Sequence, residues 1–376
     1  MLWDVFCRVI DNHGDLGVCW RLATELGQRG HRVRLWVDDA SALAWMAPGA
    51  LQASTPGVQG LVSAPGVQGL VSTPGVQMLV STPGVQVLAW TDPAPDLQPG
   101  AVVVEAFGCT LPVAFVAGMA AASPPPVWIN LEYLSAEPYG ARCHGLASPQ
   151  RTGPGAGLKK WFFFPGFTAA TGGLIQGLIP TRTAAQAWAR AQPWRARPGE
   201  RAISVFCYAN PALPALLQRL AGPPTVLWLA AGPAQQALAA AALPAGMRAV
   251  PLPPLSQTDF DRLLAAADLN LVRGEDSFVR AQLVSGQPFL WQAYPQHDGA
   301  HAAKLAAFLD LYLAGQPAPL AGAVRAAFEA YNGLAPASAS LPERLAWCSA
   351  QAGWQQRLLA QPDLCSQLLR FVLDRR

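Results

Sequence analysis

The sequence has almost no excess of charge of either sign. Its 376 residues contain 26 Lys and Arg against 23 Asp and Glu, so the formal net charge is only +3. A nucleic-acid or membrane surface normally requires a much stronger basic bias. We therefore expect no nucleic acid and no membrane among the partners, which have to be inferred from individual sites.

The sequence also lacks paired cysteines and long apolar runs. Its seven cysteines include no Cys-x-x-Cys pair, and their odd number is typical of reduced thiols in a cytoplasm. The first residues, MLWDVFCRVIDNHGD, have no basic region of the signal-peptide type. The most apolar segment is interrupted by Gly, Pro and Gln, short of the ~20 apolar residues of a membrane span. We expect a soluble cytoplasmic protein.

The N-terminal part has the alternation of a βαβ unit. Apolar runs at 2–10 and 31–39 predict strands, and the amphipathic stretch 17–30 between them predicts a helix. Further apolar runs at 101–107 and 127–134 extend this to a parallel sheet covered by helices. A site is expected beyond the C-terminal ends of these strands.

Four copies of a nine-residue unit begin at Ser54, Ser63, Ser72 and Ser81. Such a regular period is compatible with a β-solenoid. Each unit, however, carries Pro-Gly and little apolar surface, and the last copy continues into an ordinary strand, GVQVLAW. We therefore favour a duplicated surface loop, an insertion at residues 54–88, over a functional repeat.

A second alternation of strands and helices follows residues 176–200, whose Ala, Arg and Pro content is typical of a linker or bridging helix. A second doubly wound sheet is expected in residues 201–345, with C-terminal helices at 346–376. Its strands are expected at 202–208, 225–232, 247–253, 269–274 and 288–294. The predicted fold is α/β, with two Rossmann-like domains facing a cleft, as in many nucleotide-sugar glycosyltransferases.

The stretch LVRGEDSFVRAQ predicts an anion site in this second domain. A buried strand ends at Arg273, turns at Gly274 and continues as a helix, whose N-terminal N–H groups favour a phosphate. Ser277 and Arg273 are expected to help hold phosphates, while Glu275 points away and accepts hydrogen bonds from sugar or ribose hydroxyls. Asp276 is expected to order the turn. The alternative is a charged loop in which Asp276 or Ser277 caps the helix.

The first strand-to-helix turn, DNHGDLG, places Asp11 and Asp15 on either side of Gly14. It lacks the Gly-x-Gly-x-x-Gly pattern of nicotinamide and flavin sites. In the structural interpretation, Asp15 is a helix N-cap and Asp11 a turn residue. In the functional interpretation, a carboxylate at this turn is a general base.

Two further patterns resemble ligand sites. The Asp-x-Asp at 259–261 opens an amphipathic helix, where acids are favoured in any case, and the histidines show no ligand spacing, so no metal is expected. Phe206 and Tyr208 end a strand before an Asn-Pro turn. An aromatic ring there is suited either to stacking on a base or to core packing.

The sequence resembles the EarP family, the bacterial elongation factor P arginine rhamnosyltransferases, nearly from end to end. The segments that carry the resemblance are DNHGDLGVCWRLATEL, VVVEAFGC, WINLEYLSAE, LKKWFFFPGFT, TGGL, SVFCYANPAL, DFDRLLAAADLNLVRGEDSFVRAQ and WQAYPQHDGAHAAKLAAFLD. It departs from the family at His13, where an aromatic residue is usual, and in the nonapeptide array.

The resemblance implies a GT-B fold, dTDP-β-L-rhamnose as donor, no other cofactor, and one arginine of elongation factor P as acceptor. Modification of that arginine relieves ribosome stalling at polyproline. It implies that Asp11 and Asp15 are catalytic, with Asp15 the favoured base, and Glu275 is assigned to the same group. Residues 1–175 would bind the acceptor and 201–345 the nucleotide sugar. The expected substrate-binding residues are Asn12, Gly14, Tyr208, Gln257, Phe260, Arg273, Gly274, Asp276, Ser277, Tyr294 and Gln296.

Two other functions fit the same residues. A GT-B enzyme with a small-molecule acceptor would share the RGEDS pocket but would modify no protein. A non-catalytic nucleotide-sugar-binding module would bind the donor and tolerate loss of Asp15.

Overall fold

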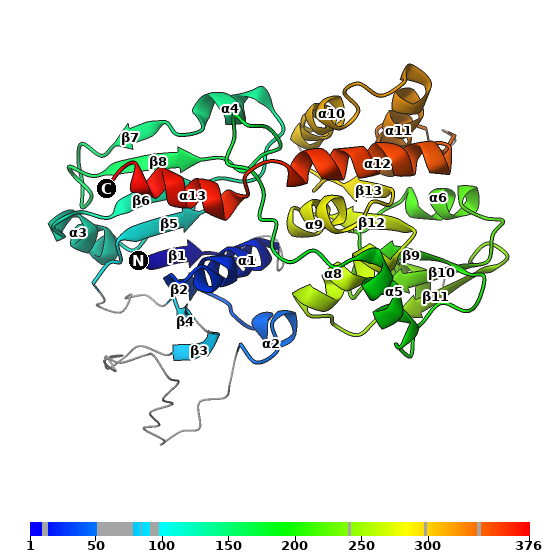
Figure 1. The fold of residues 1–376 in the computed structure, drawn as a ribbon, viewed down its shortest axis with the longest axis horizontal. Coiled ribbons are helices and arrows are strands. Elements are labelled where there is room, and N and C mark those ends of the chain that lie inside the picture. The colour runs from blue at the N-terminus through cyan, green and yellow to red at the C-terminus, as the bar shows by residue number, and fades with distance from the viewer. Residues whose placement is uncertain are drawn as a thin grey trace. The chain divides into compact units, whose positions relative to one another are not determined.

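The computed structural model of the chain describes residues 1–9, 14–50, 78–82, 84–90, 98–239, 242–296, 299–336 and 340–376, without the side chains of 78–82 and 239. These residues pack as two compact units (Figure 1). The first unit contains Met1–Glu132, Gly145–Phe163 and Leu368–Arg376, and the second contains Tyr133–His144 and Phe164–Gln367. Each unit is a β-sheet with helices packed on it, as the sequence predicts.

Within the described residues, the first unit has one eight-stranded sheet with the strand order β3-β4-β2-β1-β5-β6-β8-β7. Its strands are β1 (Leu2–Cys7), β2 (Arg32–Val37), β3 (Met78–Thr82), β4 (Val85–Ala89), β5 (Val102–Ala106), β6 (Val127–Leu131), β7 (Ala147–Pro149) and β8 (Lys159–Phe163). The five predicted strands, which include GVQVLAW at 84–90, are present with shorter bounds. The predicted parallel sheet is confirmed for β4, β2, β1, β5, β6 and β8. The two edge strands β3 and β7, which the sequence did not predict, pair antiparallel with their neighbours. Antiparallel neighbours need no crossover helix, so such short edge strands leave little pattern in the sequence.

The repeat array contributes to this sheet. Strand β4 lies in the last copy and pairs in parallel with β2, and Val85, Val87 and Leu88 are buried. Strand β3 spans the end of the third copy and the start of the fourth. The strand predicted at GVQVLAW is confirmed as β4, so the insertion does not extend to residue 88. The prediction of a surface loop is wrong for residues 78–82, which form β3, while residues 51–77 lie outside the described part of the chain.

Helices cover both faces of the first sheet: α1 (Gly14–Gln28), α2 (Leu43–Met46), α3 (Val113–Ala121) and the end of α13 (Leu364–Leu373). On one face, Phe6 stacks on Trp36 with ring centroids 5.2 Å apart, and Phe115 of α3 lies 4.8 Å from Phe6. Helix α1, which begins three residues before its predicted start at 17, packs against β1 and β2.

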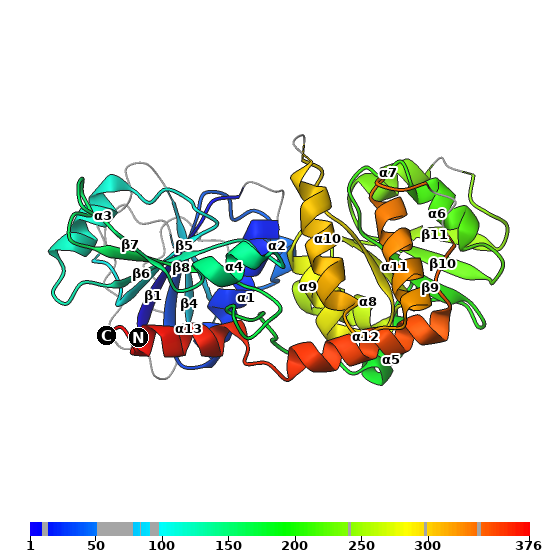
Figure 2. The same ribbon diagram turned by 90° about the horizontal axis from the view of Figure 1, so that it is seen from above.

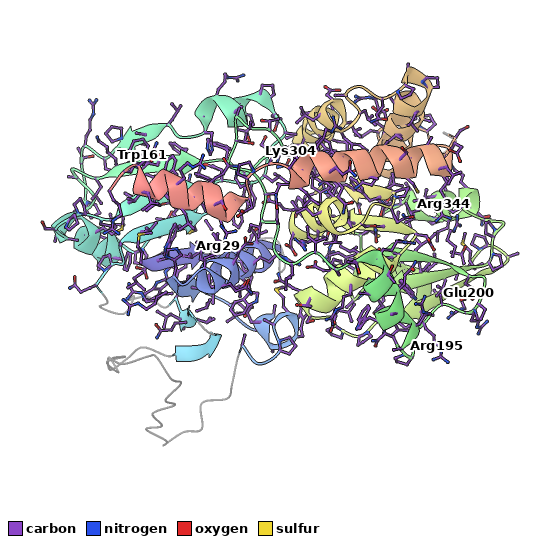
Figure 3. The ribbon with its side chains drawn as sticks, in the orientation of Figure 1. Arg29, Trp161, Arg195, Glu200, Lys304 and Arg344 are labelled. Atoms are coloured by element: carbon purple, nitrogen blue, oxygen red, sulfur yellow. The ribbon has the colours of Figure 1, made fainter. Side chains whose placement is uncertain are left out.

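The opposite face of the sheet receives the C-terminal helix. Side chains alternate between the two faces of a strand. Lys160 packs on Trp128 on the α3 face, so Trp161 and Phe163 point the other way. There, Phe371 of α13 lies 5.9 Å and 5.4 Å from their rings; Trp161 is labelled beside α13 in Figure 3.

Asp4 is an acid in the middle of a buried strand, and its role is structural. It accepts hydrogen bonds from Arg34 at 2.6 and 2.7 Å, from Trp36 at 2.9 Å and from the backbone N–H of Gly100 at 2.6 Å. A buried carboxylate is tolerated when it is paired and its oxygens are satisfied. This group therefore joins β1 to β2 and to the segment before β5.

Within its described residues, the second unit has a five-stranded sheet, all parallel, with the order β11-β10-β9-β12-β13. Its strands are β9 (Arg201–Val205), β10 (Thr225–Leu229), β11 (Met247–Pro251), β12 (Leu269–Arg273) and β13 (Phe289–Gln292). Its helices are α4 (Pro138–Cys143), α5 (Arg182–Arg190), α6 (Leu213–Arg219), α7 (Pro233–Ala239), α8 (Gln257–Ala266), α9 (Asp276–Val284), α10 (Ala300–Tyr312), α11 (Ala318–Tyr331) and α12 (Arg344–Leu359). Helix α11 contacts β13, and α12 contacts α9 (Figure 2). All five predicted strands are present, and none of the described helices is both long and apolar enough to span a bilayer.

The units do not end where composition places the boundaries. Residues 176–200 contain α5, which packs on α8 and buries Ala185 and Ala189 in the core of the second unit, where Trp194, after the helix, is also buried. The C-terminal residues 346–376 are divided, since α12 belongs to the second unit and Leu368–Arg376 to the first. A high alanine content is typical of a linker but also of a packed helix such as α5, so composition does not distinguish the two. The composition also does not change where the C-terminal residues pass from the second unit to the first.

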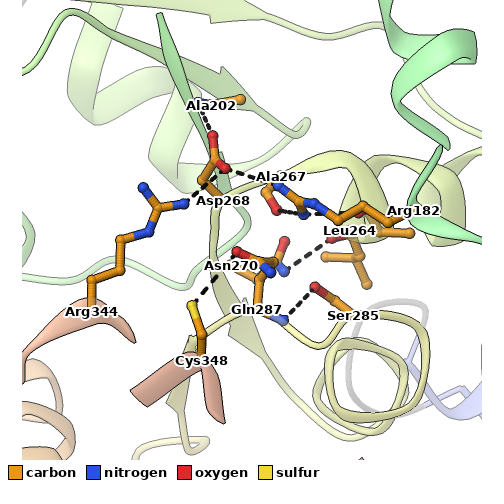
Figure 4. Close-up of polar contacts among 11 residues, drawn as sticks. Arg182, Ala202, Leu264, Ala267, Asp268, Asn270, Ser285, Gln287, Arg344 and Cys348 are labelled. Carbon is orange, nitrogen blue, oxygen red and sulfur yellow. Dashed lines mark hydrogen bonds and ion pairs between the residues drawn. The ribbon is translucent and has the colours of Figure 1, made fainter. Parts of the chain in front are cut away.

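Asp268, just before β12, connects several elements of the second unit (Figure 4). Its carboxylate pairs with Arg182 of α5 at 2.9 Å and with Arg344 of α12 at 3.0 Å. It also accepts the backbone N–H of Ala202 in β9 at 2.9 Å. These contacts lie at the N-terminal ends of β9 and β12, so they support the fold and leave the opposite edge of the sheet for a ligand.

Candidate functional site

The second sheet changes winding direction at strand β9. This strand comes first along the chain and lies between β10 on one side and β12 on the other. Ligands of open α/β sheets bind beyond the C-terminal strand ends at such a switch point. Phe206 and Tyr208, which follow β9, and Arg273, which ends β12, lie at this point. This edge is therefore the candidate site of the second unit.

Arg273 packs between aromatic rings. Its guanidinium carbon lies 4.3 Å from the ring centroid of Phe206 and 4.7 Å from that of Tyr208. Phe260 of α8 backs the first ring at 5.5 Å, and Tyr294 backs the second at 5.3 Å. In the described part of the chain, no carboxylate pairs with Arg273. The groups that contact the Arg273 guanidinium are thus aromatic rings. Stacking on their faces leaves the N–H groups at the edge of the guanidinium for an anion.

The turn after Arg273 is closed by its own hydrogen bonds. Gly274 adopts φ 60°, in the left-handed region that favours glycine. Ser277 Oγ accepts the backbone N–H of Arg273 at 3.1 Å and donates to the carbonyl oxygen of the same residue. Trp291 donates to the carbonyl oxygen of Gly274 at 2.9 Å. Because the Ser277 hydroxyl proton is used within the turn, the donors available to a phosphate are Arg273 and the first N–H groups of α9.

The two carboxylates of this turn have separate positions. Glu275 is the N-cap residue of α9, but its side chain makes no capping hydrogen bond. Its Oε2 instead accepts the backbone N–H of Leu134 at 3.0 Å, so one of the oxygens expected to meet substrate hydroxyls is engaged by the protein. Asp276 is the first residue of α9, where the helix dipole stabilises a negative charge.

The Asp-x-Asp segment belongs to helix α8, whose first residue is Gln257. Asp259 pairs with Arg262 at 2.8 Å. Asp261 is buried and binds Arg280, itself only 1% exposed, with N–O distances of 3.0 Å. Arg280 also donates to three backbone carbonyls. Both acids of this segment are therefore engaged by arginines.

The end of strand β13 carries two amides that are not fully satisfied. Gln292 is in register with Arg273 on the neighbouring strand. Among the described residues, the buried Oε1 atoms of Gln292 and of the expected site residue Gln296 have no hydrogen-bond partner. A buried acceptor without a partner costs free energy unless a ligand or water satisfies it. Sequence reasoning missed Gln292, although a Gln that closes the apolar run PFLW was a usable signal.

The first sheet has its own switch point, between β1 and β5. Asp15 lies in the first turn of α1 at this point and is only 4% exposed. It is the second residue of the helix, after Gly14, so the interpretation of Asp15 as an N-cap is wrong. Its charge also contributes to the raised pKa of Cys19, after the larger effects of Cys7 and burial. Residues 10–13 lie outside the described part, so the roles of Asp11 and Asn12 remain predictions.

A strained turn follows β5 at the same edge. Phe107 has φ 58°, the one positive φ of a non-glycine residue in the described chain, and Gly108 continues with φ 67°. Asn130 Oδ1 accepts the N–H of Gly108 at 3.3 Å. Strained backbone of this kind is concentrated at functional sites. The sequence gives no sign of it, because Phe107 reads as the end of an apolar strand.

The comparisons with known proteins agree with this geometry. Residues 3–373 match the model of the family described as elongation factor P rhamnosyltransferase EarP. The protein-arginine rhamnosyltransferase of Pseudomonas aeruginosa is 41% identical over 99% of both chains, and that of Neisseria meningitidis is 32% identical over 98% of this chain and 96% of the relative.

Solved structures give the same result. One that describes EarP-mediated arginine glycosylation of translation elongation factor EF-P is 28% identical, with a TM-score of 0.57 over 99% of both chains. The glycosyltransferase VinC, solved with dTDP, is 14% identical with a TM-score of 0.51 over the full length of both chains, and it is similar in fold alone. The architecture is therefore of the GT-B type, with two Rossmann-like units. The chain belongs to the EarP family of elongation factor P rhamnosyltransferases.

Proposed function

We propose that this protein transfers L-rhamnose from dTDP-β-L-rhamnose to one arginine of translation elongation factor P, with inversion and without a metal. The family supports the reaction, and one observation of the site supports the donor. At the switch point of the second sheet, Arg273 is stacked between Phe206 and Tyr208 with no carboxylate partner among the described residues, directly before helix α9.

This arrangement suits a nucleoside diphosphate. A guanidinium edge and the N-terminal N–H groups of a helix together stabilise an anion. They act both on the bound donor and on the diphosphate that departs as the sugar is transferred. The rings of Tyr208, Phe260 and Tyr294 around Arg273 supply apolar surface for the thymine and the sugar.

The acceptor makes the chemistry demanding. The pKa of a free guanidinium is about 13.8 and that of a carboxylate about 4, so complete deprotonation before attack would cost about 13 kcal/mol. Asp15 therefore acts during the displacement. It orients the guanidinium and takes the proton as the new C–N bond forms and the bond to the diphosphate oxygen breaks. A single displacement converts the β-linked donor to an α-linked product.

The setting of Asp15 fits that role. It is buried in the first turn of α1, where the helix dipole favours its ionised form. A carboxylate at this turn attracts a cationic acceptor. Asp11, outside the described residues, is proposed as its partner in holding the acceptor.

The charges of the donor site support a reaction without a metal, and the acceptor supports a cytoplasmic location. Arg273 and the start of α9 supply the positive charge that a divalent ion provides in many other glycosyltransferases. Both acids of the Asp-x-Asp segment already bind arginines. Because elongation factor P acts on ribosomes, the reaction is proposed to take place in the cytoplasm.

Mass spectrometry of elongation factor P tests this function. The purified protein, dTDP-β-L-rhamnose and a chelator are incubated with the factor, and a mass gain of one deoxyhexose on one arginine is expected. A factor with that arginine replaced by lysine is the control. Modification of small molecules alone, or donor binding without transfer, would contradict the proposal and support one of the other two functions.

A further inference from the structure

Glu132 lies at the C-terminal edge of the first sheet, directly after strand β6. Strand β6 is separated from β1 by β5 alone, and the register aligns Phe6 with Glu105 and Glu105 with Asn130. Neighbouring strands are about 4.8 Å apart, so the end of β6 is roughly 10 Å from the end of β1. The chain runs from the end of β1 into α1 and Asp15. Glu132 thus lies at the same C-terminal edge of the first sheet as the switch point that Asp15 follows.

A hydrogen-bond chain fixes the direction of the Glu132 side chain. Asn130, 5% exposed, donates from Nδ2 to Glu132 Oε1 at 2.7 Å. Its own Oδ1 accepts the N–H of Gly108, in the strained turn that Phe107 begins. One oxygen of Glu132 is therefore held by the protein, while the described structure assigns no partner to Oε2.

Glu132 also lacks a cation, unlike the acid beside it. Glu105 accepts from Lys160 at 2.8 Å and from Trp128 at 3.0 Å. No described Lys, Arg or His forms an ion pair with Glu132. Burial raises the pKa of Glu132, and the negative charge of Glu105 adds to this, whereas the hydrogen bond from Asn130 and the charge of Lys160 oppose it. A half-buried carboxylate without a cation destabilises the resting protein and favours binding of a positively charged group.

We propose that Glu132 binds the guanidinium of the acceptor arginine and so selects a cationic acceptor. This inference rests on the proposed function. The Glu132 carboxylate accepts N–H groups from the nitrogens that do not react, which leaves the remaining nitrogen for Asp15. Glu132 takes no proton; the proton released on C–N bond formation goes to Asp15.

The test is Glu132→Gln in the full chain, which keeps the acceptor oxygen for Asn130 and removes only the charge. The KM for elongation factor P is expected to rise by at least about tenfold, the loss of one charge-assisted contact. The affinity for dTDP, measured by calorimetry, is expected to stay within about twofold, because the donor residues lie in the other unit. Glu137→Gln, five residues further along, is the matched control. Glu137 is the N-cap residue of α4, makes no side-chain capping bond, and its loss should leave both constants unchanged.

A structural role for Glu132 predicts different results. If Glu132 stabilises the fold, Glu132→Gln should have a lower unfolding temperature than the parent. If Glu132 binds the acceptor, its unfolding temperature should be equal or higher, because the repulsion from Glu105 is relieved. Glu132→Asp, which keeps the charge one carbon shorter, should recover part of the acceptor KM. An unchanged acceptor KM in Glu132→Gln, with transfer by the parent intact, would overturn the Glu132 inference alone. Absence of transfer by the parent protein would overturn the proposed function and this inference with it.

Discussion

Replacement of Arg273 by Ala tests the donor site most directly. The guanidinium lies 4.3 and 4.7 Å from two ring centroids and has no carboxylate partner in the described chain. Its removal therefore leaves no orphan acid, and folding should lose only the two ring contacts, about 1 to 2 kcal/mol. In the complex, a bidentate contact to the diphosphate is lost, about 2 to 4 kcal/mol. The Kd for dTDP should rise by about 30- to 800-fold.

Calorimetry with three ligands separates the loss of the diphosphate contact from a general loss of the pocket. Affinity for dTDP and dTDP-β-L-rhamnose should fall together, since both carry the diphosphate. Affinity for thymidine, which carries no phosphate, should not change. The dTDP affinity of Arg273→Lys should lie between those of the parent and Arg273→Ala, because lysine keeps the charge and loses the planar fork. Arg262→Ala, which removes an exposed pair on α8, is the matched control. Unchanged dTDP affinity in Arg273→Ala would show that this arginine is a structural partner of the rings.

Four further outcomes are expected. Asp15→Asn should keep dTDP affinity and lower single-turnover transfer by at least about 100-fold; a rate within tenfold of the parent would show that Asp15 is structural. Asp261→Ala should destabilise the second unit by about 3 to 5 kcal/mol in urea unfolding, because it leaves Arg280 buried without its counter-charge; a smaller loss would mean that the backbone carbonyls suffice. Deletion of 54–71, two repeat copies that leave the β3 and β4 sequences intact, should change stability by less than about 1 kcal/mol, and a tenfold loss of transfer would reveal a function for the array. Glu132 has a raised pKa when folded, so its ionisation lowers the free energy of unfolding as pH rises through that pKa and has no effect at low pH. Glu132→Gln should therefore be more stable than the parent at pH 7, and the difference should vanish in acid.

Much of the site could be read from local sequence. Apolar runs of five or six residues, each followed by an amphipathic stretch, predict both sheets, because a strand buried on both faces and a covering helix each impose their own period. The strand-Gly-helix pattern at Arg273 predicts an anion site, because its elements are adjacent in the chain. The placement of Asp15 at the first strand-to-helix turn was predicted for the same reason.

Other features depend on residues that are distant along the chain. The aromatic contacts of Arg273 come from Phe206 and Tyr208, more than sixty residues earlier in the sequence, and β9 becomes a neighbour of β12 only in the folded sheet. The edge strands β3 and β7 were missed because an antiparallel edge needs neither length nor a covering helix. Composition could not show that α12 belongs to the second unit and most of α13 to the first, because the apolar face of α13 would suit the core of either unit.

The sequence by itself determined the fold class, the family and the positions of the two strand-to-helix turns, because these are set by local pattern and by motifs contiguous in the chain. Only the tertiary structure decided which charges are satisfied. Asp4, Asp261 and Glu105 each meet a cation from another element, whereas Glu132, one further acid in an apolar context, meets an amide and no cation. The free energy of a buried charge depends on what surrounds it in space, and no local pattern contains that information.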